Sequence, residues 1–117
     1  SGGSGGGDYS ARGPPTVWRA ARHGKIRDLE NMITLETVDE RDSKGNTCLH
    51  HACMHNKKRV CKMLLRLRAD INAKNYAGNT PLHYLFGYNY NELGEYLISK
   101  GADDTILNNA GATCREV

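Results

Sequence analysis

The chain repeats itself at a spacing of 33 residues, and this constrains its fold more than any other feature. Residues 42–74, DSKGNTCLHHACMHNKKRVCKMLLRLRADINAK, align with residues 75–107, NYAGNTPLHYLFGYNYNELGEYLISKGADDTIL. Upstream, residues 17–33 fit the same pattern with one residue deleted in the following loop, and residues 108–117 begin a further copy. A fixed period of this length indicates supersecondary units that bury their apolar faces only by stacking side by side.

Each unit is expected to contain a tight turn and two short helices. A Gly-Asn pair opens the unit, and both residue types tolerate the positive φ angles of tight turns. Thr47 and Thr80 follow as predicted N-caps, and Pro81 stands at the first helical position, where its missing N–H costs nothing. The first helix is expected to break at Asn56 or Asn89, and a second helix follows.

The repeated segments identify a family resemblance. GNTPLH (78–83), GNTCLHHA (45–52) and ADINAKN (69–75) resemble the ankyrin repeat, and the period matches as well. The resemblance covers roughly residues 16 to 117, as an N-terminal repeat, two full repeats and the start of a fourth. It implies an all-α solenoid of stacked helix-turn-helix units joined by β-turn or hairpin loops.

The predicted domain organisation follows from the repeat. Residues 1–15 are rich in Gly, Ser and Pro and are interpreted as a flexible linker or cloning remnant. Residues 16–117 form the repeat domain, divided into 16–41, 42–74, 75–107 and 108–117. Because the last unit stops inside its first helix, we expect a monomeric fragment of a longer chain.

Composition excludes several classes of protein. No run approaches the roughly 18 apolar residues that a membrane span needs, and no signal peptide is present. The net charge of +3 is too small to demand a nucleic acid partner. The four cysteines show no disulfide-framework spacing and are interpreted as reduced thiols of an intracellular protein, cytoplasmic or nuclear. They are Cys48, Cys53, Cys61 and Cys114.

The stretch TCLHHACMH (47–55) has the residue types of a metal site, but its repeat partner, TPLHYLFGY, keeps only one of the histidines. Zinc needs four ligands, or three and a water. His51 and His55 are therefore interpreted as a solvent-facing pair, and Cys53 as a buried thiol. The resemblance implies that His50 hydrogen-bonds within the turn and helix start. We predict neither a metal nor another cofactor.

The sequence predicts no enzyme. Its loop carboxylates do not form a facing acid–base pair, and no Ser-His-Asp or Cys-His arrangement is indicated. The alternatives to a non-catalytic protein-interaction module are a regulatory or targeting domain of a larger enzyme or chromatin protein, and a basic module for anionic lipid or nucleic acid. Nucleic acid is disfavoured because stacked aromatic residues are missing near the basic run. That run comprises Lys57, Lys58, Arg59, Lys62, Arg66 and Arg68.

The resemblance implies a binding site for a protein or peptide partner. Ankyrin stacks usually bind partners through turn tips and first helices, which line a concave groove. Tyr, Arg and Met suit such a surface because they concentrate binding energy or adapt to varied partners. The alternative for each tyrosine is packing against a neighbouring repeat. The predicted binding residues are Arg22, His23, Ser43, Lys44, Asn46, Met54, His55, Tyr76, Ala77, Asn79, Gly87 and Tyr88.

Two positions depart from the family pattern, and a third is a candidate site of modification. Arg68 stands where the next repeat has Gly101, so that helix end is expected to be strained. Phe86 replaces a small residue, so the third repeat is expected to be wider or locally looser. Asn72 occupies the position that asparagine hydroxylases modify in some ankyrin repeats.

Overall fold

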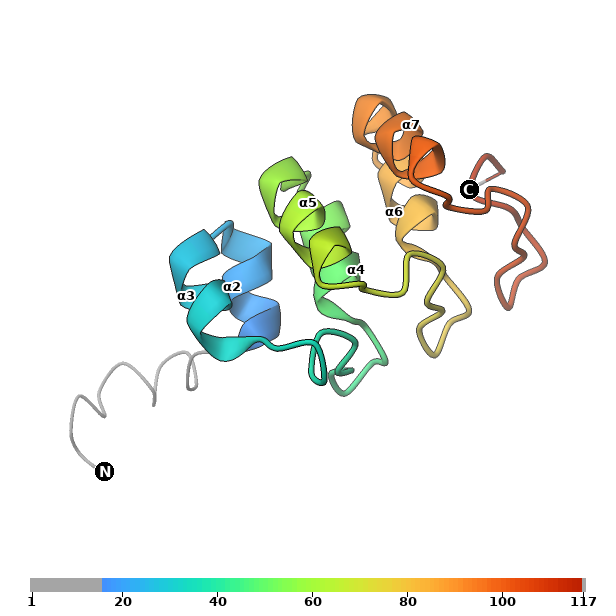
Figure 1. Ribbon diagram of the computed structural model, residues 1–117. Helices are drawn as coiled ribbons and strands as arrows, with labels where there is room; N and C mark the ends of the chain where they lie inside the picture. Colours follow the sequence, from blue (N-terminus) through green and yellow to red (C-terminus); the bar gives the residue numbers. More distant parts are fainter. Residues whose placement is uncertain (1–15, 117) are drawn as a thin grey trace.

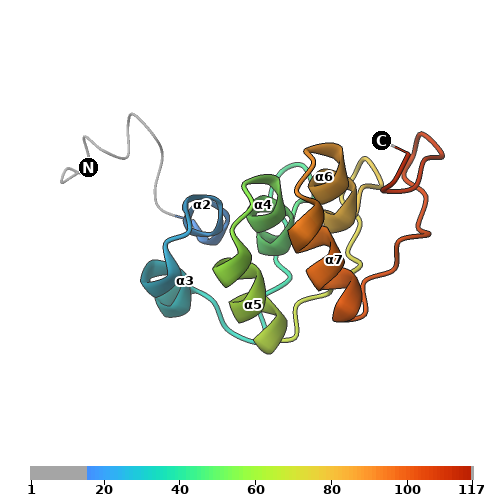
Figure 2. The same cartoon turned by 90° about the horizontal axis from the view of Figure 1, so that it is seen from above.

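The computed structural model describes residues 16–116, which form three successive pairs of short helices. The first helices lie in one row and the second helices in another, so each pair repeats its predecessor along the stack (Figure 1, Figure 2). The pairs are α2 (Val17–His23) with α3 (Ile26–Met32), α4 (Cys48–Met54) with α5 (Lys58–Arg66), and α6 (Pro81–Gly87) with α7 (Asn91–Ser99). The described residues contain no strand, which confirms the all-α repeat fold.

The linker predicted for residues 1–15 lies outside the described residues, as does Val117. Residues 108–116 form turns in place of the first helix expected there. They still repeat the hydrogen bonds of the earlier loops, because the Asn108 carboxamide accepts from the amides of Ala110 and Ala112 at 2.9 and 3.0 Å. The polar loop of a further repeat unit is thus present without its helix.

A threonine precedes each first helix, as predicted for Thr47 and Thr80, and Thr16 takes the same place before α2. The Thr16 hydroxyl accepts a hydrogen bond from the Arg19 amide at 3.1 Å, and Thr47 caps α4 through the His50 amide. Thr80 precedes α6, whose first residue is Pro81. Since a helix N-terminus leaves its first amides without partners, these residues set the three starting points.

A polar ladder joins the loops of successive repeats. The Asn75 carboxamide oxygen accepts from two amides of its own loop, while its nitrogen donates to the Asn46 side chain at 2.8 Å. Asn108 repeats this one unit later and donates to Asn79 at 2.9 Å. In the first loop Asp42 takes the same place, and its carboxylate accepts from the amides of Lys44 and Asn46. The ladder holds neighbouring loops in register.

The core runs between the helix rows and is built from leucines at repeating positions. Each repeat contributes aliphatic side chains that stack on those of the next repeat. Since a single helix pair cannot bury its apolar face alone, the core exists only in the stack. The fully buried leucines are Leu29, Leu49, Leu64, Leu82, Leu85 and Leu97.

Helix ends use left-handed backbone where the sequence predicted breaks. Asn56 and Asn89 have φ angles of 56° and 66° and separate the first helix from the second in their repeats. Arg68 has a φ of 67° where Gly101 has 106°, so the expected strain at that helix end is present. A non-glycine side chain in this region costs on the order of 1 kcal/mol.

The large Phe86 side chain is matched by a glycine on the facing helix. A Cβ atom on Gly94 would lie 2.7 Å from the Phe86 ring, which is closer than real contacts allow. One repeat earlier the same two positions hold Cys53 and Cys61, whose sulfur atoms are 3.8 Å apart. Two cysteine side chains of medium size in one repeat are thus replaced, in the next repeat, by the large Phe86 side chain facing a glycine that has no side chain. The wider or looser packing predicted here is therefore not needed to admit Phe86.

Candidate functional site

The predicted binding residues occupy the loop tips and the C-terminal ends of α2, α4 and α6. Most of them are exposed or partly exposed, as a contact surface requires. Tyr76 and Tyr88 stand out, because 68% and 53% of their surfaces are exposed. The exposed or partly exposed members are Arg22, His23, Ser43, Lys44, Met54, His55, Tyr76, Ala77, Asn79, Gly87 and Tyr88.

Asn46 was wrongly placed on this surface. Only 5% of it is exposed, and its carboxamide oxygen accepts the hydrogen bond from Asn75 described above. Asn79 is half-buried and has the same role toward Asn108. Both are structural members of the polar ladder, and Asn46 cannot reach a partner. In the sequence, the Asn that ends each turn looks like an exposed polar residue. In the structure, its side chain accepts a hydrogen bond from the next repeat.

Tyr76 and Tyr88 present aromatic rings from two different settings. The Tyr76 ring lies over Gly45, where an added Cβ would stand 2.6 Å from it, and its backbone amide donates to the Lys44 carbonyl at 3.2 Å. The Tyr88 ring lies between those of Tyr84 and Tyr90, at 6.3 and 5.9 Å between centroids. Each ring therefore contacts neighbouring groups of the chain while more than half of the residue's surface faces solvent. Such half-fixed rings lose little rotamer freedom when a partner covers them.

Basic side chains lie close together at the C-terminal ends of α2 and α4. The pKa of His55 is lowered, mainly by burial and further by the charges of Arg22, His51 and His23. Arg22 also carries a buried Nε atom that has no hydrogen-bond partner. An arginine guanidinium binds carboxylate and phosphate groups well. The surface thus carries Arg22 and two histidines toward the N-terminus of the stack and aromatic residues toward its third repeat.

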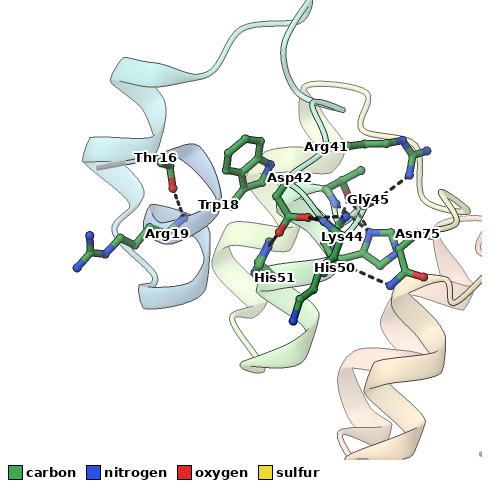
Figure 3. Close-up of polar contacts among 12 residues, drawn as sticks. Thr16, Trp18, Arg19, Arg41, Asp42, Lys44, Gly45, His50, His51 and Asn75 are labelled. Atoms are coloured by element: carbon green, nitrogen blue, oxygen red, sulfur yellow. Dashed lines mark hydrogen bonds and ion pairs between the residues drawn. The ribbon is translucent and has the colours of Figure 1, made fainter. Parts of the chain in front are cut away.

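His51 is buried, which corrects its expected exposure beside His55. Its Nε2 atom lies 2.7 Å from an Asp42 oxygen, and its Nδ1 atom is buried without a partner (Figure 3). Burial raises the pKa of Asp42, but the His51 hydrogen bond and two backbone amides outweigh it, so the pKa is lowered overall. One repeat later Asn75 donates to the Tyr84 hydroxyl at 2.7 Å. Asp42 and His51 stand 33 residues before Asn75 and Tyr84, so an Asp–His pair in one repeat corresponds to an Asn–Tyr pair in the next.

The cysteine and histidine stretch that suggested a metal is taken up by folding contacts. His50 bonds within its helix start, His51 bonds Asp42, and the sulfur atoms of Cys48 and Cys53 are buried. Among residues 16–116, no group of three or more His, Cys, Asp or Glu side chains is placed to hold a metal ion.

We expect a chelator to leave the thermal unfolding midpoint unchanged, because no complete ligand set supports the fold. Differential scanning calorimetry with and without EDTA measures this directly, and elemental analysis is the matched check. A zinc content near one per chain that is lost together with the folded state would contradict the expectation.

Three of the buried cysteines are held in their uncharged thiol form. Burial raises the pKa of Cys48 to about 12, assisted by the charges of Glu40, Asp39 and Asp42. Burial likewise raises the pKa of Cys53 and of Cys114. Since thiolates are the nucleophilic form, these three sulfur atoms are unreactive at neutral pH. They serve as small apolar side chains of the core.

His50 links its own turn to the next repeat. Its Nδ1 atom accepts from the Thr47 amide at 3.1 Å, and its Nε2 atom donates to the Asn79 carbonyl at 2.9 Å. His83 repeats the arrangement and reaches the Ala112 carbonyl. The predicted hydrogen bonding is confirmed, and the bond to the following repeat was not anticipated. The geometry requires the neutral ring, because Nδ1 must accept while Nε2 donates.

The comparisons with known proteins agree with this architecture. A family model described as ankyrin repeats in three copies matches residues 17–108. The chain belongs to the ankyrin-repeat family. Ankyrin repeats generally mediate protein–protein interaction, and the repeated loops and helix pairs described above are the scaffold on which they do so.

Two curated proteins resemble this ankyrin-repeat chain over about half of its length. One is palmitoyltransferase akr1 of Schizosaccharomyces pombe, 35% identical over 60 residues, which are 50% of this chain and 9% of that protein. Another is ankyrin repeat domain-containing protein 13C-A of Xenopus laevis, 38% identical over 52 residues, or 44% of this chain and 10% of that protein. The matched part is thus about a tenth of each relative.

Proposed function

We propose that this ankyrin-repeat chain is a non-catalytic module that binds a partner protein or peptide through its loop tips and first helices. The observation that carries the proposal is the exposure of Tyr76 and Tyr88 on a surface of which Lys44 and His55 are also members. Exposed aromatic and cationic side chains are the residue types that anchor protein interfaces. An extended segment that crosses successive repeats would meet both kinds.

The two ends of this surface favour different chemistry in the partner. Arg22 favours an acidic side chain, because its guanidinium is charged at neutral pH and binds carboxylate groups well. Tyr88, with Tyr84 and Tyr90 beside it, favours an apolar or aromatic side chain. The partner segment we propose therefore combines acidic and apolar residues, with the acidic part toward α2 and the apolar part toward α6.

We expect Tyr76→Ala, Met54→Ala and Tyr88→Ala each to weaken partner binding by about 1–2 kcal/mol or more, because few anchors carry most of the energy of an interface. A peptide selected from a displayed library against the folded chain supplies the probe, and calorimetric titration measures each variant. Arg27→Ala, an exposed change on α3, is the matched control and should bind as the parent does.

Circular dichroism must first establish that each variant is folded, since the Tyr76 ring also covers Gly45. Normal binding by all three folded variants, together with loss of binding on changing exposed α3 or α5 residues, would move the site to the second helices. That outcome would defeat the proposal.

A second candidate is that the chain recruits substrates or targets for a larger enzyme, with chemistry elsewhere in that protein. The similarity to a palmitoyltransferase favours this arrangement, because the matched segment is only 9% of that protein. None of the helices between residues 16 and 116 is both long and apolar enough to cross a membrane. Sequencing the full transcript decides the matter, because a catalytic domain in the same reading frame would support it and its absence would oppose it.

A further inference from the structure

Three lysine side chains converge on one aromatic ring on the face formed by the second helices. The ammonium groups of Lys58, Lys62 and Lys100 lie 5.1, 5.8 and 5.6 Å from the centre of the Tyr96 ring. Lys58 and Lys62 are one turn apart on α5, and Lys100 directly follows α7, the neighbouring second helix (Figure 2). We call these four residues the lysine cluster. It joins two repeats at a single point.

No acidic side chain neutralises the lysine cluster. In the described part of the chain, none of its three ammonium groups has a carboxylate within 4.0 Å. Glu95 of α7 lies nearby in sequence but pairs with Arg115 at 3.5 Å. Each contact with the ring is worth only about 0.5–1 kcal/mol at an exposed site. The mutual repulsion of the three positive charges opposes that gain, so an anion bound beside them would be stabilising.

The lysine cluster is a feature of this sequence and not of the repeat scaffold. One repeat unit before Tyr96 stands Met63, and one unit after Lys58 and Lys62 stand Asn91 and Glu95. The Tyr96 side chain also packs against the core, but the stacking of the helices requires none of the three lysines. Their convergence needs a reason other than the fold.

We propose that the lysine cluster binds a compact polyphosphorylated headgroup of the inositol phosphate class. Lysine ammonium groups bind phosphate as point charges, and three of them around one ring match several phosphate groups carried on a small frame. The Tyr96 ring holds the three ammonium groups close together, so that one small ligand could contact all of them. Arg59 and Arg66 are also exposed on α5 and extend the positive field toward a membrane surface that carries such headgroups.

The geometry favours this class over the other anionic partners. Single-stranded nucleic acid is bound by a series of aromatic rings along a groove, whereas the cluster has one ring. An acidic peptide spreads its charges along an extended backbone, whereas the three ammonium groups all lie within 5.8 Å of the centre of one ring. Lys57, although it belongs to the same basic run, folds its aliphatic stem over Gly24 and takes no part.

The test compares two triple variants of the whole chain. Lys58→Gln, Lys62→Gln and Lys100→Gln remove the cluster, and Lys25→Gln, Arg27→Gln and Lys74→Gln remove the same charge from exposed positions outside it. The probes are soluble inositol trisphosphate, studied by calorimetry, and phosphatidylcholine vesicles with phosphatidylinositol bisphosphate, studied by flotation. We expect the cluster variant to bind on the order of a hundredfold more weakly and the control variant to bind nearly as the parent does.

Binding of the soluble trisphosphate alone would identify a free inositol phosphate as the ligand, and binding of the vesicles alone would identify the lipid. Both outcomes support the proposal. Equal losses in the two triple variants would overturn it, since net charge would then explain the binding. So would equal binding to phosphatidylserine vesicles of matched charge, or binding to nucleic acid or polyglutamate with neither headgroup source bound.

Discussion

Leu64→Ala is expected to lower the free energy of unfolding by about 2–5 kcal/mol. Leu64 is fully buried on α5, and Leu97 repeats its position one unit later on α7. Removing the γ carbon and the two δ methyl groups leaves a cavity between helices that the packed neighbouring repeats cannot fully close. Urea denaturation followed by far-ultraviolet circular dichroism measures the change as a shift of the midpoint.

The control is Glu30→Ala on the exposed side of α3, which should change stability by no more than about 0.5 kcal/mol. Because a small stack has a total stability of only about 5–15 kcal/mol, the Leu64 variant must be assayed at low temperature and without denaturant at the start. Similar midpoints for the two variants would contradict the assignment of Leu64 to the inter-repeat core.

Acidification is expected to destabilise the domain through His50. Burial lowers the pKa of His50 from 6.5 to about 4, although its bond to the Asn79 carbonyl opposes the shift. Between pH 6.5 and about pH 4, His50 is protonated in the unfolded chain but stays neutral in the folded chain. The stabilisation is therefore complete above pH 6.5 and is lost as the pH falls toward 4. The expected loss between neutral pH and pH 4.5 is about 2–3 kcal/mol.

Other groups act alongside His50, so the test must observe that ring itself. The lowered pKa of His55 adds to the loss in the same direction, and the lowered pKa of Asp42 acts only at more acid pH. NMR of the His50 ring is expected to report a neutral imidazole at about pH 5, while the acid sensitivity of unfolding is smaller in a His50→Gln variant. A His50 ring that titrates near its ordinary value would contradict this account.

The sequence predicts the architecture well because its signals are local and repeated. The threonine caps, Pro81 and the asparagine breaks each act within one turn of the chain, and their recurrence after 33 residues fixes the element order. The strain at Arg68 was also predicted, because the next repeat has a glycine at the same position. A repeat supplies its own comparison, so departures from it are visible without any other sequence.

The polar contacts between repeats were harder to predict, since their partners lie about thirty residues apart. Asn46 was taken for a surface residue because nothing in its own turn reveals the donor on Asn75. His51 was taken for an exposed residue for a different reason. Its partner, Asp42, stands in its own unit, but Asn75 and Tyr84 hold these positions one repeat later, so the repeat did not suggest an Asp–His pair. The match between Phe86 and Gly94 needed the facing helix to be placed first. Local reasoning finds caps and breaks but not contacts across the stack.

The binding face itself is tested most directly by NMR mapping with the selected peptide. Amide chemical shifts of the isotope-labelled chain are followed as the peptide is added, so the backbone amides of residues 16–116 are all observed in one experiment. The account predicts shifts at the loop tips and first-helix ends, including Tyr76, Ala77 and Tyr88, while α3 and α5 change little. Shifts confined to the second helices, with the resonances of Tyr76 and Tyr88 unmoved, would contradict the central claim.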